Sequence, residues 1–141
     1  MRSKPNPYRT QATAIGGRVG GAASCDGRLK VRLDRPDDPA GRGTNPEQLF
    51  AAAYAACFLA AIRRVAADEG LEIAADSNVT ARVALDGKAD QPISDGLSVQ
   101  LVVDLPGIAD EAAARLIAGA HRICPYSRAI RGNVDVGLRL G

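Results

Sequence analysis

The longest apolar stretch of the chain, residues 49–62, carries no charge and almost no polar atom on any face. The residues before it predict where a helix begins: Asn45 can cap the free backbone donors, Pro46 suits the first helical position, and Gln48 completes a capping box. Gly70 predicts its end, because glycine commonly follows a helix C-terminus. A helix that is apolar on every face is buried on every face. This one is too short and too rich in alanine to span a bilayer comfortably, so we predict the central core helix of a soluble domain.

Alternating apolar and polar positions predict strands on both sides of this helix. The predicted strands are residues 8–15, 19–24 and 29–33 before the helix, and residues 79–85, 97–105 and 134–138 after it. Gly16-Gly17 and Asp26-Gly27 are turn signals, so the first three strands should form a meander. The next two strands should pair as a hairpin, with a long connection that starts at Asp86-Gly87 and passes Pro92.

Two further helices are predicted between the hairpin and the last strand. Residues 110–123 carry acidic residues in the first turn and basic residues in the last, as the helix dipole favours. Pro125 then starts a short helix to Arg131, which leaves Cys124 at or near its cap. The resulting order, βββ-α-ββ-α-α-β, predicts an α+β fold.

Length and composition narrow the function classes. The 141 residues suit one domain, so we expect a single domain over residues 1–141 with residues 1–7 as a mobile arm. The net charge of +2 and the lack of a basic run argue against a nucleic-acid partner. No apolar segment follows the N-terminal charges, so we expect a cytoplasmic protein with no membrane partner. His121 is the only histidine and the three cysteines form no CxxC motif, so we expect neither a metal site nor a disulfide framework.

The central helix also suggests how the chain assembles. A helix that is apolar on every face needs cover on every side, and a chain of this size with so few large side chains supplies that cover poorly. A homodimer that shares the core helices of its two copies would supply it.

Two cysteines are candidates either for chemistry or for packing. Cys57 lies in the middle of the apolar helix, where a free cysteine is most often a small hydrophobe. Cys124 lies at a predicted helix start, where the helix dipole favours a thiolate, although Cys-Pro also occurs without any reactive role. The pair is consistent with a reactive and a resolving cysteine.

A thiol in apolar surroundings resists ionisation, so a nucleophilic Cys57 requires a cation nearby. Arg18 is the candidate, because the glycines before it allow a close backbone approach; its commonplace role would be a solvated turn residue. Glu47 suits the first turn of the helix by its charge alone. It lies about 15 Å along the helix from Cys57. Glu47 therefore cannot touch the Cys57 of its own helix, but it can orient an arginine or reach a thiol across a dimer interface.

Several long motifs follow one another along the chain: Gly16-Gly17-Arg18-Val19-Gly20, Ser24-Cys25-Asp26-Gly27, Gly43 to Ala52, Tyr54-Ala55-Ala56-Cys57-Phe58 and Cys124 to Val134. Together they closely resemble the organic hydroperoxide resistance (Ohr) proteins of the Ohr/OsmC family. The resemblance runs in order from about Thr10 to Leu140. It implies an OsmC-like fold with antiparallel sheets around a buried central helix. It also implies an intertwined homodimer with two active sites at the subunit interface.

The same resemblance implies a cysteine-based peroxidase without a bound cofactor. Cys57 would be the peroxidatic cysteine and Cys124 the resolving one, and the two would form a disulfide after each turnover. Arg18 would hold Cys57 as a thiolate and polarise the peroxide, while Glu47 would hold Arg18. The family prefers organic and fatty-acid hydroperoxides over hydrogen peroxide, and its members are typically reduced by dihydrolipoyl groups, so a dithiol reductant is expected.

An apolar wall supplied by Phe50, Tyr54 and Phe58 would favour an alkyl tail on the substrate. Three alternatives remain at this stage. One is an OsmC-type peroxidase with a different substrate and reductant preference, and another is a non-catalytic dimer that binds hydrophobic ligands. The third, a cysteine hydrolase that pairs Cys57 with His121, lacks support, because a histidine near a helix end is commonly a solvated cation.

Overall fold

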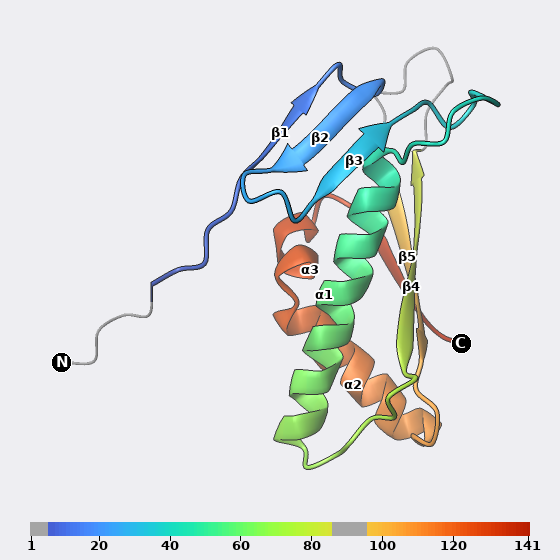
Figure 1. The fold of residues 1–141 in the computed structure, drawn as a ribbon. Coiled ribbons are helices and arrows are strands. Elements are labelled where there is room, and N and C mark those ends of the chain that lie inside the picture. The colour runs from blue at the N-terminus through green and yellow to red at the C-terminus, as the bar shows by residue number, and fades with distance from the viewer. Residues whose placement is uncertain (1–5, 86–95) are drawn as a thin grey trace. The chain divides into compact units, whose positions relative to one another are not determined.

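The computed structural model describes residues 6–85 and 96–141. The first part of the predicted arm and the connection through Asp86-Gly87 and Pro92 lie outside the described residues. The chain divides into two compact units, Met1–Pro46 and Glu47–Gly141. The element order along the chain is the predicted one (Figure 1).

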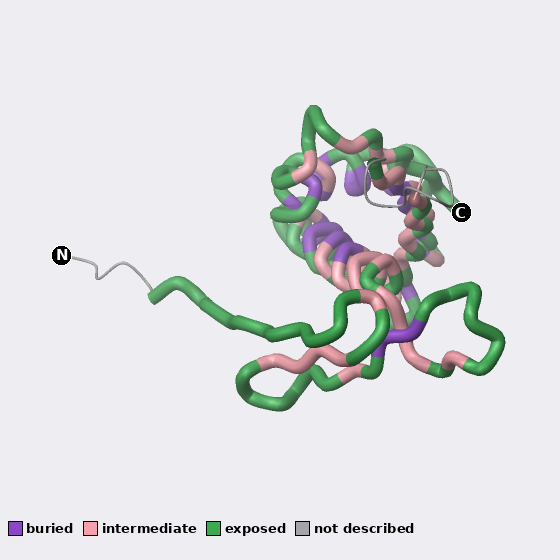
Figure 2. The backbone as a smooth tube through the Cα atoms, turned by 90° about the horizontal axis from the view of Figure 1, so that it is seen from above, coloured by how far each residue is buried: buried purple, intermediate pink, exposed green. Residues whose placement is uncertain are grey.

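The N-terminal unit contains the predicted three-stranded meander. Its strands are β1 (Ala12–Ile15), β2 (Gly20–Ser24) and β3 (Lys30–Leu33), and they pair in antiparallel fashion. The first strand begins at Ala12 and so is shorter than the predicted strand from Tyr8. Figure 2 shows these strands as half-buried or exposed almost throughout, and Leu33 is the only buried hydrophobic side chain among residues 6–46.

Asp34 fastens the segment that leads from β3 towards the first helix. Its Oδ2 atom accepts hydrogen bonds from the backbone N–H groups of Arg42 at 3.0 Å and Gly43 at 2.6 Å. The bond from Gly43 is the main reason that the pKa of Asp34 is lowered, against the opposing effect of burial. The backbone adds two bonds, from Asp34 to Thr44 at 3.0 Å and from Thr44 to Arg32 at 2.9 Å. The far end of the segment, residues 42–44, is therefore held against the end of β3.

The C-terminal unit combines three helices with a three-stranded sheet. Its elements are α1 (Pro46–Asp68), β4 (Asn78–Leu85), β5 (Leu97–Asp104), α2 (Asp110–Ile123), α3 (Pro125–Ile130) and β6 (Val136–Leu140). The end of α1 is the predicted one. Gly70 has a φ of +72°, and the N–H groups of Gly70 and Leu71 bond back to the carbonyls of Ala67 and Ala66, as in a Schellman motif.

The core of this unit lies between α1, α2 and one face of β5. Alternate residues of β5 are buried, as their period-two pattern predicts. The buried cluster consists of Tyr54, Phe58, Ala61, Ile62 and Ala66 from α1, Val99, Leu101 and Val103 from β5, Ala113, Leu116, Ile117 and Ala120 from α2, and Leu105 and Cys124 beside them. The helices and the sheet thus form two layers around a single core.

The second sheet differs in one respect from the predicted antiparallel arrangement. β4 and β5 form the expected antiparallel hairpin, but β6 pairs with β5 in parallel. The chain passes through α2 and α3 before β6, and parallel neighbours require a crossover of this length. The sheet is therefore mixed, with β5 at its centre, while the α+β class is as predicted.

Within one chain, α1 is buried along a stripe and not on every face. Its buried residues face the core cluster, whereas Ala52, Ala56 and Ala60 are exposed at a spacing of four residues. Residues at this spacing lie on one side of a helix, so the three alanines form an apolar strip of small side chains. The prediction of burial on every side is wrong for the single chain.

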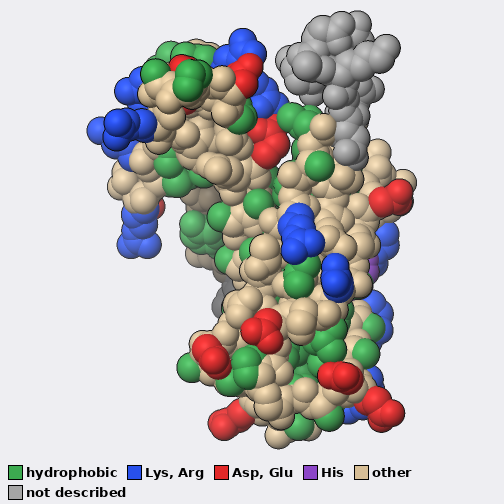
Figure 3. All heavy atoms as spheres, turned by 90° about the vertical axis from the view of Figure 1, so that its right-hand side faces the viewer, with side chains coloured by type: hydrophobic (Ala, Val, Ile, Leu, Met, Phe, Trp, Pro, Cys, Tyr) green, Lys and Arg blue, Asp and Glu red, His purple; other side chains and the backbone are tan. Residues whose placement is uncertain are grey.

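Acidic side chains gather at the end of the C-terminal unit where α1 stops and α2 begins (Figure 3). Asp110 and Glu111 lie in the first turn of α2, where the helix dipole favours negative charge. Arg115 of the same helix lies 3.7 Å from Glu69. Both partners are exposed, and an exposed ion pair contributes little stability. The position of α2 therefore depends mainly on its packing against α1.

Gly119 sets how closely α2 approaches α1, because a Cβ atom there would lie 2.9 Å from Cγ1 of Val65. We predict that Gly119→Val lowers the free energy of unfolding by about 1–3 kcal/mol, the usual cost of overpacking. Gly137→Val is the control, because a Cβ atom there would meet nothing nearer than 3.6 Å. Urea midpoints measure both effects. Equal midpoints would show that the two helices have room to spare at Gly119.

Candidate active site

Two cysteines distant in sequence meet in the C-terminal unit. Cys57 on α1 and Cys124 at the end of α2 are both free thiols, and their Sγ atoms lie 3.6 Å apart. The Cys124 thiol donates to the Cys57 sulfur. Cys57 is half-buried and Cys124 is fully buried, so Cys57 is the thiol that an incoming molecule reaches first. A disulfide needs the sulfurs closer by only about 1.5 Å.

Cys124 belongs to two helices at once. Its N–H group donates to the carbonyl of Ala120 at 2.8 Å, which closes α2, and its carbonyl accepts from Arg128 at 3.0 Å, which opens α3. Pro125 cannot donate a hydrogen bond, so α2 cannot continue through it. This confirms the predicted cap position of Cys124. Its side chain makes no capping hydrogen bond and is directed towards Cys57 instead.

The start of α3 also bears on Cys57. Burial raises the pKa of the Cys57 thiol, and the neighbouring Cys124 raises it further. The backbone amide of Tyr126, in the first turn of α3, lowers that pKa in part. The sequence suggested this helix start only as an environment for Cys124. Since the pKa remains raised, a reactive Cys57 needs positive charge beyond this one amide.

A buried chain of polar groups lies beside the thiols. The hydroxyl of Tyr54 on α1 lies 2.5 Å from the Ser127 hydroxyl on α3, which in turn lies 2.9 Å from Nδ1 of His121 on α2. Burial is the main reason that the pKa of Tyr54 is raised. Sequence reasoning did not identify Ser127. The available signal was a serine one helical turn after Cys124, in the same short helix.

His121 differs from the solvated cation that its position near a helix end suggested. Its side chain is half-buried, and burial together with the nearby charge of Arg131 lowers its pKa. The imidazole is therefore neutral at neutral pH. Arg131 also fastens this region, because its guanidinium donates to the His121 carbonyl at 2.7 Å. The hydrogen-bond partner of the ring is Ser127, and a hydrolase pair of Cys57 with His121 gains no support.

Aromatic rings pack around Tyr54, with Phe58 and Tyr126 stacked on it and Phe50 tilted against it. Its ring centroid lies 5.8 Å from Phe50, 6.3 Å from Phe58 and 6.0 Å from Tyr126. Tyr54 and Phe58 are fully buried, whereas Phe50 is half-buried. Of the three residues predicted to bind substrate, Phe50 has exposed surface and the other two lie within the core. A role for them in substrate binding remains a prediction.

The turn between β1 and β2 presents Arg18, as the sequence suggested. Gly16 and Gly20 on either side have φ values of +86° and +155°. A Cβ atom at Gly16 would lie 2.1 Å from the Val19 carbonyl oxygen, and one at Gly20 would lie 2.0 Å from that of Ile15. Only glycine fits at these two positions. The backbone of Arg18 is therefore confined to a tight turn.

Arg18 and Glu47 belong to different units. Arg18 lies in the N-terminal unit, and Glu47 lies in the first turn of α1, at the start of the C-terminal unit. The negative charge of Glu47 suits the positive end of the helix dipole at that turn. The structure thus brings together Cys57 and Cys124, while the expected roles of Arg18 and Glu47 beside Cys57 remain predictions.

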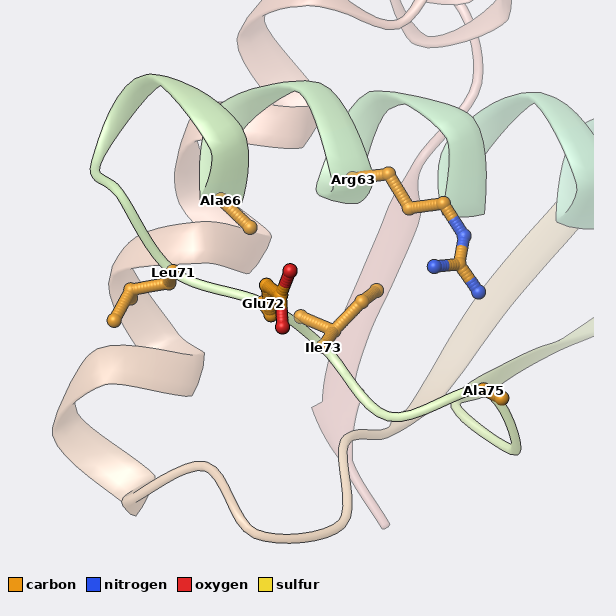
Figure 4. Close-up of a pocket in the computed structure, with 6 residues that line it drawn as sticks. All are labelled: Arg63, Ala66, Leu71, Glu72, Ile73 and Ala75. Carbon is orange, nitrogen blue, oxygen red and sulfur yellow. The ribbon is translucent and has the colours of Figure 1, made fainter.

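A separate pocket of about 470 Å³ lies near the end of α1. Figure 4 shows Arg63 extending over it from α1, with Glu72 and Ile73 on the segment that follows. Neither thiol lines it. Among residues 6–85 and 96–141, no group of three or more His, Cys, Asp and Glu side chains could hold a metal ion.

In the described part of the chain, α1 is the one helix long and apolar enough to cross a membrane by length and composition. A core helix of a soluble protein passes the same test. The large side chains of α1, Tyr54, Phe58 and Ile62, are buried against β5 and α2. This packing favours the predicted role of α1 as a core helix.

Known proteins are similar to this chain along almost its whole length. A family model described as OsmC-like protein matches residues 37–139. The organic hydroperoxide resistance protein of Xanthomonas axonopodis pv. citri is 43% identical over 136 residues, which cover 94% of each chain. The organic hydroperoxide resistance protein OhrB of Bacillus subtilis is 44% identical over 138 residues, which cover 94% of this chain and 97% of OhrB.

The fold of the chain is also similar to that of a solved structure. The crystal structure of B. subtilis OhrB superimposes with a TM-score of 0.86, covering 95% of this chain and 98% of that one. The fold is OsmC-like, as the sequence motifs implied. With a family model that matches most of the chain and relatives above 40% identity, the chain belongs to the OsmC-like family, among its organic hydroperoxide resistance proteins.

Proposed function

We propose that this protein is a thiol-dependent peroxidase that reduces alkyl and fatty-acid hydroperoxides to alcohols. The observation that carries the proposal is the pair of free thiols 3.6 Å apart, one half-buried and the other fully buried. An accessible thiol can meet the peroxide, and a buried neighbour can close a disulfide with it. The names of the relatives, which refer to resistance to organic hydroperoxides, support the substrate class.

The reaction has three steps. The Cys57 thiolate attacks the distal peroxide oxygen, the O–O bond breaks, and the alcohol leaves after taking up a proton, so that Cys57 becomes a sulfenic acid. Cys124 then condenses with the sulfenic acid to form a disulfide and release water. A dithiol, in our proposal a dihydrolipoyl group, reopens that disulfide by thiol–disulfide exchange.

Arg18 supplies the positive charge in this proposal. Burial raises the pKa of Cys57, and the Tyr126 amide offsets that effect only in part. A guanidinium remains charged at any pH in which the protein works, so it can stabilise the thiolate and polarise the peroxide. Glu47, as a carboxylate, can hold the guanidinium in a bidentate geometry. The tight turn around Arg18 supports this role, because it limits where the side chain can go.

The aromatic rings around Tyr54 favour organic substrates. Phe50 offers exposed apolar surface, and Tyr54 and Phe58 support it from the core. An alkyl tail buries apolar area against such a wall, whereas hydrogen peroxide has no tail to bury. The expected preference is therefore for alkyl and fatty-acid hydroperoxides.

We also propose that the protein is a cytoplasmic homodimer. A three-stranded sheet with one buried hydrophobic residue needs cover from elsewhere, and Ile15 and Val19 are 77% and 57% exposed. The alanine strip Ala52, Ala56 and Ala60 on α1 needs cover for the same reason. A second copy of the chain would cover both surfaces.

The direct test is peroxide consumption by the purified protein. We expect turnover of tert-butyl and linoleic hydroperoxides to exceed turnover of hydrogen peroxide, and dihydrolipoamide to support turnover better than glutathione does. Absence of turnover with every organic hydroperoxide would refute the peroxidase assignment.

Cysteine variants assign the three thiols. Cys57→Ser should abolish reaction with peroxide, because the hydroxyl of serine is a far weaker nucleophile. Cys124→Ser should consume one equivalent and then stop as a sulfenic acid, detected by intact mass and by trapping with a carbon nucleophile. Cys25→Ser is the matched control, because Cys25 is exposed on the β2–β3 hairpin. Normal cycling of Cys124→Ser with dihydrolipoamide would remove Cys124 from the mechanism.

The pH dependence of Cys57 oxidation tests Arg18. Without the guanidinium the thiol keeps the raised pKa that burial gives it, so less thiolate is present at neutral pH. We expect Arg18→Met to slow oxidation at pH 7 by about tenfold or more, and its rate to rise with pH as the thiol ionises. Arg28→Met, at an exposed arginine of the same unit, should behave as the parent protein. A pH profile of Arg18→Met that matches the parent would contradict the proposed role.

The dimer can be tested at the alanine strip. We expect Ala56→Arg to shift the protein from dimer to monomer in analytical ultracentrifugation, because it places a charge in an apolar contact. Ala114→Arg, at an exposed position on α2, is the control. A parent protein that sediments as a monomer at every concentration would refute the dimer.

A further inference from the structure

The hydrogen-bonded chain Tyr54–Ser127–His121 joins the same three elements as the thiol pair. Tyr54 lies one helical turn before Cys57 on α1, and His121 lies one turn before Cys124 on α2. Ser127 lies one turn after Cys124 on α3. The polar chain and the two sulfurs are therefore two adjacent links between α1 and the junction of α2 with α3.

The central member of this polar chain is Ser127. Its side chain has no exposed surface, and its hydroxyl contacts both the Tyr54 hydroxyl and Nδ1 of His121. A serine hydroxyl can donate one hydrogen bond and accept others, so it satisfies both neighbours at once. Removing it leaves the buried Tyr54 hydroxyl and the half-buried His121 ring without their partner. A buried polar group that has lost its partner costs more than an apolar group of the same shape in its place. Apolar packing alone requires no hydroxyl at this position.

We infer that Ser127 is a positioning residue for disulfide formation. It holds the first turn of α3 against α1, so that the Cys124 thiol stays within reach while Cys57 is a sulfenic acid. This inference rests on the proposed peroxidase function. It concerns the second step of the reaction and no group that touches the peroxide.

The step itself is balanced without any further reagent. The S–O bond of the Cys57 sulfenic acid and the S–H bond of Cys124 break, an S–S bond forms, and the hydroxyl group leaves with the thiol proton as water. The Cys57 sulfur is reduced and the Cys124 sulfur is oxidised. The sulfurs must approach by about 1.5 Å, so a small displacement of α3 changes the rate strongly.

A competing reaction makes the positioning measurable. A sulfenic acid that waits for its partner is oxidised by a second molecule of peroxide to a sulfinic acid. The ratio of sulfinic acid to disulfide at a fixed peroxide concentration therefore reports how fast Cys124 closes the disulfide. A change that only lowers the stability of the fold does not move this ratio as long as the protein stays folded.

The experiment exposes the full-length protein, reduced beforehand, to graded excesses of tert-butyl hydroperoxide without reductant. Intact mass separates the disulfide, which has lost two hydrogens, from the sulfinic acid, which has gained two oxygens. For Ser127→Ala we expect the ratio of sulfinic acid to disulfide to rise by about five- to thirty-fold, the range for losing one to two ordinary hydrogen bonds. Tyr54→Phe, which removes one hydroxyl and keeps the ring, should raise it less.

Two matched comparisons sharpen the result. Ser77 is also buried, and its hydroxyl makes no hydrogen bond within the described structure, so Ser77→Ala should leave the ratio unchanged. His121→Asn keeps a polar atom near the position of Nδ1 and should retain most of the parent behaviour, whereas His121→Leu should resemble Ser127→Ala. Urea unfolding of each variant shows that it is folded under the conditions of the assay.

The outcomes separate the inference from the function on which it rests. A parent protein that forms neither disulfide nor sulfinic acid would overturn both. A parent protein that forms the disulfide, with unchanged ratios in Ser127→Ala and Tyr54→Phe, would overturn the positioning role alone. Ratios for His121→Asn and His121→Leu that both match the parent protein would likewise exclude His121 from the positioning chain.

Discussion

The close approach of α1 to the junction of α2 with α3 is the constraint on which the C-terminal unit depends. Gly119 has no side chain, so α2 can lie close to α1. Five residues later, Cys124 at the junction contacts Cys57 on α1. Two sulfur atoms attract each other only weakly, so their separation is set by what surrounds them. The core cluster supplies most of that support, and the polar chain through Ser127 adds direction that apolar packing lacks.

The same burial that brings the thiols together works against their ionisation. A thiolate is the reactive form, yet an apolar setting disfavours any charge. In the C-terminal unit, the Tyr126 amide lowers the pKa of Cys57 in part. The candidate cation, Arg18, lies in a turn of the other unit. In the proposed enzyme, one unit supplies a dry site and the other supplies charge. The proposed reactivity of Cys57 therefore depends on a residue that its own unit does not contain.

Local patterns predicted most of the fold, and the exceptions have physical reasons. Backbone rules that act over a few residues predicted the end of α1 at Gly70, the start of α3 at Pro125 and the alternation in β5. The structure confirms all three. The parallel pairing of β6 depends on a crossover through two helices, which no local pattern encodes. Composition predicted that one chain covers α1 poorly, but it does not say which face stays exposed, so the position of the alanine strip had to come from the structure. His121 and Ser127 lie on different helices, and the angle between those helices brings them together. Their spacing in the sequence alone therefore did not predict the hydrogen bond between them.

The distance in sequence between the two thiols has a thermodynamic consequence. Cys57 and Cys124 are 67 positions apart, and the segment between them contains β4, β5 and α2. A bond between the sulfurs would turn that segment into a closed loop, which restricts the unfolded chain by about 4 kcal/mol in the chain-entropy model. The oxidised form would then resist denaturation and proteolysis better than the reduced form. Oxidising conditions would therefore convert the protein into its more stable form.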